Sequence, residues 1–435
     1  MTNGFLKNIT LTFTSRFLSA VFAALSTILI ARAFGPVGKG IFTMVAFIPA
    51  LALNIGHLGL GNANTYLISQ DKDKTKNSFY NSFWYGLIIG SLFIIIFALL
   101  YRFFPRDIFG KGDIGSRYFL VALFTIPFAL WENFYQGIFV GRQEFKFFNL
   151  VSLFSKVLLF IGLLIFTLIL KIDIRWSVLY YLVIMILPAT IYNLYLLFHY
   201  GRPNNFDKSI FKQAINFGFR SYSACILAYL VLRSDIYFVN LYRGFQEVGF
   251  YSIATNFVDA ILLIVSSTTL VLFPRITGNQ EQSFDITLKV SRAISFIIGS
   301  IIIFSFIFGK WFIPLIFGAA YKASLPAFYV LLPAIYFWAI TSILLQFFAS
   351  RNLPWIVVFI WLPGFIINII LNIIYIPRYG IVAAALTSLL AYSLTFVLYY
   401  LYLQRIQKTR LRQLLITNIS EIKLIINKLI KRNEN

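Results

Sequence analysis

Long apolar stretches alternate with short polar segments along the whole chain. A bilayer core is about 30 Å thick, and about 20 apolar residues in an α-helix are enough to cross it. Breaking the chain at charge clusters and at Gly, Pro and Asn gives twelve predicted spans. They lie at residues 10–33, 41–68, 79–103, 117–140, 147–170, 176–199, 214–241, 249–273, 290–312, 324–349, 355–376 and 380–403. The pattern predicts an all-α polytopic membrane protein.

The longest connection, HYGRPNNFDKSIFKQ, follows the sixth predicted span and divides the spans into two sets of six. We therefore expect four segments along the chain. They are an N-terminal six-helix lobe at 1–200, a cytoplasmic linker at 201–213, a C-terminal six-helix lobe at 214–403 and a basic amphipathic cytoplasmic tail at 404–435.

The two sets of spans resemble copies of one another. The stretch FGPVGKGIFTMV, which begins at Phe34, aligns with RGFQEVGFYSIA, which begins at Arg243, so that Gly35 meets Gly244 and Gly40 meets Gly249. At the same offset, Phe139 and Arg142 meet Phe348 and Arg351. Six crossings return the chain to its starting side, so the copies are expected to be parallel repeats about an axis along the membrane normal.

Composition supports the membrane assignment and narrows the partners. The chain is 60% hydrophobic and only 12% charged, with a mean hydropathy of +0.82. Its net charge of +22 comes from Lys and Arg scattered among apolar segments, which favours anionic lipid headgroups over nucleic acid. One cysteine and two histidines exclude an internal disulfide and a Cys or His metal cluster. No metal site or cofactor is expected.

Basic residues also indicate the orientation. The predicted loops of the two sides carry nearly equal numbers of Lys and Arg, but the tail from Gln404 adds eight more. By the positive-inside rule both termini are expected in the cytoplasm. Residues 411–430 have apolar residues at helical spacing with lysines among them, which fits either a helix on an anionic membrane surface or a solvated basic tail.

Four stretches resemble polysaccharide flippases, the Wzx-type exporters of the MATE-like MOP superfamily. ILIARAFGPVGKGIFTMV is similar to the end of their first helix, and RSDIYFVNLYRGFQEVGFYSIA resembles their junction of helices seven and eight. GHLGLGNANTYLIS and LVLFPRIT resemble the ends of helices two and eight. His57 and Lys39 depart from the family pattern, which has an acidic residue or Ser at the first position and an apolar or aromatic residue at the second.

The resemblance implies a V-shaped protein of two six-helix lobes. It would move a polyprenyl-pyrophosphate-linked oligosaccharide repeat unit, such as an O-antigen unit, from the cytoplasmic to the outer leaflet of the cell membrane. The sugar would occupy a polar cavity lined by helices 1, 2, 7 and 8. The protein would act as a monomer, beside a polysaccharide polymerase and chain-length machinery.

Ionisable residues near the centre of a membrane helix cost about 2.5–3.5 kcal/mol each on insertion scales, so those present are functional or paired. Seven lie well inside the predicted spans: Arg16, Glu132, Lys156, Arg220, Arg233, Asp235 and Asp259. Glu132 and Lys156 lie at similar depths on successive helices. A structural pair is the favoured interpretation, and a role in ion coupling is the alternative.

Arg16 and Arg220 each lie six residues into the first span of their half, about 9 Å from the cytoplasmic face. A guanidinium binds phosphate oxygens bidentately, so the two are candidates to hold a pyrophosphate. The alternative is that both side chains reach the lipid headgroups.

The stretch LVLRSDIYFVNL places Arg233 and Asp235 two residues apart, which is about 200° around a helix, so each needs its own partner. Asp235 is expected to bind the turn leading to Gly249. Asp259 is a candidate for ion coupling. Arg233 is either a second phosphate contact or the counter-ion of Asp259.

Asn62, Asn216 and Asn256 are candidates to hydrogen-bond sugar hydroxyls, although bonding between helices is the alternative for each. No nucleophile and base set and no GxxxxGK[ST] loop is present, so catalysis and ATP hydrolysis are not expected. Energy would come from an ion gradient or the membrane potential.

Three other functions are alternatives to this one. A MATE-type cation or drug antiporter would need a negatively charged cavity, whereas Arg16 and Arg220 would make this one positive. A flippase of another lipid-linked cell-wall precursor shares every feature above. A membrane glycosyltransferase or polymerase would need clustered acidic residues on a large external loop, and no predicted loop is long enough.

Overall fold

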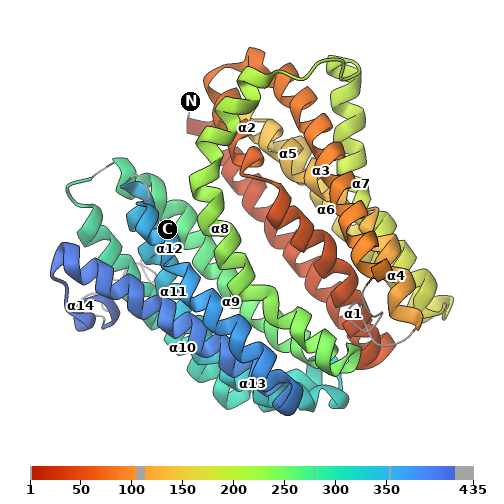
Figure 1. Ribbon diagram of the computed structural model, residues 1–435, viewed down its shortest axis with the longest axis vertical. Coiled ribbons are helices and arrows are strands. Elements are labelled where there is room, and N and C mark those ends of the chain that lie inside the picture. Colours follow the sequence, from red (N-terminus) through yellow and green to blue (C-terminus); the bar gives the residue numbers. More distant parts are fainter. Residues whose placement is uncertain (1, 104–112, 279, 352–353, 417–435) are drawn as a thin grey trace. The chain divides into compact units, whose positions relative to one another are not determined.

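The computed structural model describes residues 2–103, 113–278, 280–351 and 354–416, and its secondary structure over these ranges is helical (Figure 1). The chain divides into two compact units. Unit 1 contains Met1–Ile226, Val239–Phe250 and Ile316–Ala320, and unit 2 contains Leu227–Phe238, Tyr251–Leu315 and Tyr321–Asn435. Division of the chain into lobes at 1–200 and 214–403 remains a prediction from the sequence repeat.

Unit 1 is a bundle of antiparallel helices (red to light green in Figure 1). Its helices are α1 (Thr2–Gly56), α2 (Leu60–Gln70), α3 (Thr75–Phe103), α4 (Asp113–Leu123), α5 (Ile126–Gly141), α6 (Phe145–Leu164), α7 (Ile174–Tyr200) and the first half of α8 (Lys208–Arg243). Helix α1 packs on α4, α5 and α6, whereas α2 and α3 pack on α5. Helix α7 covers α5 and α6.

Unit 2 contains most of the second half of the chain. Its helices are the greater part of α9 (Phe245–Gly278) and α10 (Ser283–Phe317), with α11 (Leu325–Ser350), α12 (Trp355–Phe359), α13 (Trp361–Gln407) and α14 (Leu411–Leu415). Helices α11 and α13 lie along each other. A short stretch of α8, Leu227–Phe238, also belongs to this unit.

Among the described residues, ten helical segments are long and apolar enough to cross a membrane. Two of them, Thr14–Gly56 with 43 residues and Trp355–Gln407 with 53, are about twice the length that one crossing needs. Each contains a kink at a glycine with positive φ, Gly35 (φ 63°) and Gly380 (φ 61°). Each kink separates two of the twelve predicted spans. The prediction of an all-helical polytopic membrane protein is therefore confirmed.

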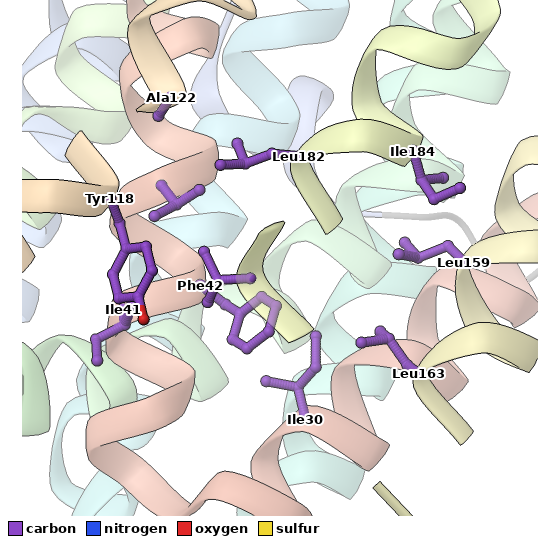
Figure 2. Close-up of a cluster of buried hydrophobic side chains, with 11 residues drawn as sticks. Ile30, Ile41, Phe42, Tyr118, Ala122, Leu159, Leu163, Leu182 and Ile184 are labelled. Atoms are coloured by element: carbon purple, nitrogen blue, oxygen red, sulfur yellow. The ribbon is translucent and has the colours of Figure 1, made fainter. Parts of the chain in front are cut away.

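Apolar side chains on both limbs of the kinked α1 form one buried cluster (Figure 2). Ile30 lies before the kink at Gly35, and Ile41 and Phe42 lie after it. The cluster is completed by Val45, Tyr118, Ala122, Leu159, Leu163, Val178, Leu182 and Ile184 from α1, α4, α6 and α7. Helices within a membrane associate largely by close van der Waals packing, so this cluster holds the two limbs of α1 at a fixed angle.

The two copies of the sequence repeat have the same local structure at their aligned glycines. Gly35 (φ 63°, ψ −170°) and Gly244 (φ 81°, ψ −176°) have nearly the same backbone conformation. A Cβ atom on Gly40 would overlap the carbonyl oxygen of Phe245, and one on Gly249 would overlap that of Pro36. Pro36 corresponds to Phe245 under the repeat alignment, so the contact is reciprocal.

The segment that links the two halves of the sequence is held against α3. Asp207 accepts hydrogen bonds from the backbone N–H groups of Ser209 (2.9 Å) and Ile210 (3.1 Å) and so caps α8. Asn81 binds both backbone groups of Asp207, donating to its carbonyl oxygen at 2.9 Å and accepting from its N–H at 2.8 Å. Asn77 donates to the Asp207 carboxylate at 2.9 Å.

The start of the basic tail is docked on α10. Three consecutive carbonyl oxygens of α14 accept side-chain hydrogen bonds, from Arg292 to Gln413 (2.9 Å), from Ser291 to Leu414 (3.0 Å) and from Ser295 to Leu415 (2.8 Å). Residues 417–435, which contain most of the stretch 411–430 for which a surface helix or a solvated tail was expected, lie outside the described residues.

Candidate functional site

Arg233 and Asp259 form an ion pair within unit 2. Arg233 Nη2 on α8 lies 2.5 Å from Asp259 Oδ1 on α9, and the two side chains are 21% and 38% exposed. In this structure Arg233 is the counter-ion of Asp259, which is one of the two alternatives predicted for it. Both charged side chains are therefore only partly buried.

Asp235 lies in the same unit and is almost completely buried. Its Oδ2 accepts hydrogen bonds from the hydroxyl groups of Tyr251 and Ser388, the latter at 3.0 Å, and its Oδ1 accepts one from the N–H of Ile236 at 2.8 Å. Tyr251 lies two residues after Gly249, beyond the turn that Asp235 was expected to bind. Three donors on one carboxylate make this group a structural junction of α8, α9 and α13.

A chain of neutral polar groups joins α8 to α13. Ser234 Oγ donates to Asn368 Oδ1 at 2.9 Å, and Asn372 Nδ2 donates to the same oxygen at 2.9 Å. Thr387 in turn donates to Asn372 Oδ1. Asn368 Nδ2 is buried and has no hydrogen-bond partner among the described residues. Sequence reasoning did not select these residues, although Asn368 and Asn372 are one helical turn apart within an apolar span.

Glu132 and Lys156, in unit 1, are near each other without direct contact. Glu132 accepts a hydrogen bond from Gln136 Nε2 at 3.1 Å, and Lys156 is near enough to interact with it electrostatically. No salt bridge joins the two side chains in the described structure, and Lys156 is exposed on α6. The structural pairing of these two charges therefore remains a prediction.

The two arginines proposed for a pyrophosphate are described to different extents. Arg16 is exposed on α1 and forms no ion pair within the described part of the chain. Arg220 belongs to α8, but its side chain lies outside the described residues. Their joint role remains a prediction.

The second predicted span, 41–68, is interrupted at residues 57–59, where Leu58 (φ 44°) and Gly59 (φ 77°) leave the helical conformation. Carbonyl oxygens freed by such a break need partners inside a membrane. Tyr222 donates its hydroxyl to the carbonyl of Ile55, and Tyr85 donates to that of Gly56 at 2.9 Å. His57 Nδ1 accepts from the N–H of Gly59 at 3.0 Å.

The three candidate asparagines lie in different surroundings. Asn62 on α2 and Asn216 on α8 are exposed in unit 1. Asn256 on α9 is half-buried in unit 2, and its Nδ2 has no partner among the described residues. The structure therefore brings Arg233, Asp235 and Asp259 together in unit 2 and places Asn62 and Asn216 in unit 1.

A family model described as polysaccharide biosynthesis protein matches residues 5–280. The chain belongs to this family. A search of curated protein sequences finds no significant match.

Solved structures share the fold across nearly the whole chain. A structure titled lipid II flippase MurJ, inward closed conformation, superposes with a TM-score of 0.75 at 16% identity, over 97% of this chain and 91% of that one. An inward-facing multidrug resistance MATE family transporter of the MOP superfamily gives 0.70 at 15% identity, over 90% and 96%. A MOP superfamily transporter from Pyrococcus furiosus gives 0.59 at 15% identity, over 92% and 95%. The expected membership of a polysaccharide biosynthesis family with a MATE-like fold is confirmed.

Proposed function

We propose that this protein is a flippase that moves a polyprenyl-pyrophosphate-linked oligosaccharide from the cytoplasmic to the outer leaflet of the plasma membrane. The observation that carries the proposal is the combination of the polysaccharide biosynthesis family with a multi-pass fold that solved transporters share. Polysaccharide units that are assembled on a lipid at one face of a membrane must cross that membrane to reach the cell surface. A chain that carries no set of catalytic residues fits this transport step. The product would be a surface polysaccharide such as O-antigen.

The charge of the chain supports an anionic substrate. The net charge is +22, and Arg16 is an exposed cation on a membrane helix. A cation antiporter would require free carboxylates, yet in unit 2 Asp259 is paired with Arg233 and Asp235 is occupied by three donors. We therefore propose that Arg16 and Arg220 bind the pyrophosphate.

The Arg233 and Asp259 pair is the proposed site of ion coupling. Protonation of Asp259 would remove the charge that holds Arg233, so the two helices α8 and α9 would lose an attraction that is present when the carboxylate is ionised. The proposal includes both termini in the cytoplasm and a monomer that acts beside a polysaccharide polymerase and its chain-length machinery.

Reconstituted liposomes test the function directly. The purified protein is inserted into vesicles that contain a polyprenyl-pyrophosphate-linked oligosaccharide, and the glycan exposed to an external pyrophosphatase is measured over time. We expect exposure of the inner-leaflet pool with the wild-type protein and about tenfold slower exposure with Arg16→Ala. Vesicles that retain this pool while they expel a cationic dye would instead establish an antiporter.

The same assay tests a second candidate substrate. The similarity to a structure titled lipid II flippase makes a lipid-linked cell-wall precursor the alternative cargo, because both lipids share the polyprenyl pyrophosphate. Faster exposure of lipid II than of the oligosaccharide-linked lipid would select this alternative.

A further inference from the structure

Helix α2 exposes a different kind of surface from that of its neighbour α3. The apolar residues Leu60, Ala63, Leu67 and Ile68 of α2 are buried. The exposed positions are Asn62, Tyr66, Ser69 and Gln70. On α3 the exposed positions between residues 77 and 100 are all apolar, namely Ile88, Leu92, Ile95, Ile96, Leu99 and Leu100. The apolar surface of α3 is suited to contact with lipid hydrocarbon. Hydrocarbon would leave the side-chain amides of α2 without hydrogen-bond partners, so the exposed stripe of α2 is suited to water or a polar ligand.

Two aromatic rings lie parallel on this stripe. Tyr66 of α2 stacks on Phe217 of α8, with ring centroids 4.1 Å apart and planes inclined by 8°. Both belong to unit 1, and they are 40% and 47% exposed. A stacked pair that remains this exposed presents a flat apolar surface on an otherwise polar face.

The helix break at residues 57–59 holds α8 against the start of α2. A Cβ atom on Gly59 would lie 2.9 Å from the Cα of Gly218, so the two backbones touch. The hydroxyl of Tyr222, one turn further along α8, binds the carbonyl of Ile55. Because Gly218 adjoins Phe217, these contacts fix the ring pair in advance of any ligand, which lowers the entropy lost on binding.

Free hydrogen-bonding groups accompany the rings. Asn62 lies one turn before Tyr66 on the same face, and Asn216 precedes Phe217. The side chains of Asn62, Asn216 and Tyr66 make no hydrogen bonds within the described part of the chain. Asn64, two residues from Asn62, is buried and donates to Ser82 (2.9 Å) and to the carbonyl of Phe134 (3.2 Å). Asn64 therefore joins helices, whereas Asn62 is available to a ligand.

We propose that Tyr66, Phe217, Asn62 and Asn216 form a subsite that binds a sugar ring of the glycan, an inference that rests on the proposed flippase function. A pyranose has a face of C–H groups that packs on an aromatic ring and a rim of hydroxyl groups that pair with amides. None of the four side chains carries a charge, so they match neutral sugar rather than pyrophosphate. A lipid tail would leave the amides unsatisfied.

Two lipid probes separate sugar recognition from lipid recognition. Lipid-linked oligosaccharide extracted from cells that lack the flippase gene is one probe, and sugar-free polyprenyl pyrophosphate is the other. Binding of each to the purified protein is measured by native mass spectrometry. We expect wild-type protein to prefer the glycosylated lipid, and Tyr66→Leu and Phe217→Leu to lose about tenfold in affinity for it without loss for the sugar-free lipid.

Two variants serve as matched controls. Phe219→Leu removes a ring that is 46% exposed on the same helix but lies about 200° around it from Phe217, so the preference should be unchanged. Tyr66→Phe keeps the stacked ring and should retain most of the preference. The elution volume of each purified variant checks that it is folded.

Three outcomes would count against the subsite. If both leucine variants retain the full preference for the glycosylated lipid, the rings do not bind sugar. If they lose both lipids equally, the pair has a structural or lipid-binding role. If wild-type protein binds no glycosylated lipid at all, the proposed function is wrong and the subsite fails with it.

Discussion

Asp235 is a buried carboxylate whose interactions all come from uncharged donors, apart from the more distant charge of Arg233. A buried charge is costly unless its lone pairs are occupied, and here three donors occupy them. The residue therefore stabilises the fold only as long as the complete set of donors is present.

Asp235→Asn tests this account of the carboxylate. The amide would turn an NH₂ group toward donors that need an acceptor, so we expect the variant to lose about 2–3 kcal/mol of stability. Ser388→Ala, which removes one donor, should cost about 1 kcal/mol. Unfolding of the purified proteins in detergent measures both values. An Asp235→Asn protein as stable as wild type would contradict the assignment.

The ion pair of Arg233 and Asp259 is open to a double-mutant test. Arg233→Gln and Asp259→Asn each leave one charge without its partner, whereas the double variant removes both charges together. We expect the double variant to be more stable than at least one single variant. We also expect Asp259→Asn to lose ion-driven transport even with Arg233→Gln present. Strict additivity of the two stability losses would show that the pair contributes nothing.

Sequence reasoning selected the charged residues of unit 2 but not their neutral partners. Charges inside apolar spans are conspicuous because their insertion cost is high, and helical geometry showed that Arg233 and Asp235 need different partners. Ser388 lies 153 positions from Asp235 along the chain. No local pattern connects such distant residues, and a serine in an apolar helix costs too little to draw attention.

At the scale of helices, glycines decide where backbones approach closely. Gly40 and Gly249 each face a backbone carbonyl of the other copy of the repeat, whereas a Cβ on Gly299 of α10 would meet no atom within 4 Å. A methyl group at the first two positions must displace a helix end, because the overlapping atom is backbone.

Gly40→Ala should therefore reduce the yield of folded protein in the membrane by several-fold. Gly299→Ala is the matched control, and it should be neutral or stabilise by about 0.5–1 kcal/mol because alanine favours a helix interior. Size-exclusion chromatography of fluorescent fusions compares the two variants with wild type. Equal yields for both alanine variants would show that the contact at Gly40 tolerates a methyl group.

Hydropathy located most of the helices but not their breaks. Gly35 lies between two predicted spans and Gly380 is the first residue of the last one, and at both positions the structure has a kink instead of a loop. The break at residues 57–59 was not predicted, because HLG continues an apolar run. It depends on Gly218, Tyr222 and Tyr85, which are distant in sequence, so it is a tertiary feature.

At the scale of the whole molecule, the sequence halves and the compact units differ. The first part of α8 belongs to unit 1, although it follows the linker and opens the second half of the sequence. Its contacts with Gly59 and Ile55 both lie across that linker.

Cutting the chain within the linker tests whether the helices before the linker depend on the first part of α8. We expect a fragment of residues 1–204 expressed alone to be degraded, because it lacks the α8 residues that cap the break in the second span. Co-expression with residues 205–435 should restore both fragments to the membrane as a complex that co-purifies. A stable fragment of residues 1–204 without its partner would contradict this expectation.

The reciprocal contact at the repeat glycines has a consequence for descent. In a two-fold symmetric dimer, if residue i of one subunit contacts residue j of the other, then residue j of the first subunit contacts residue i of the second. Gly40 with Phe245 and Gly249 with Pro36 meet this condition inside a single polypeptide. Duplication and fusion of the gene for a six-helix homodimer would produce such a chain, with the ancestral subunit interface preserved as an internal contact.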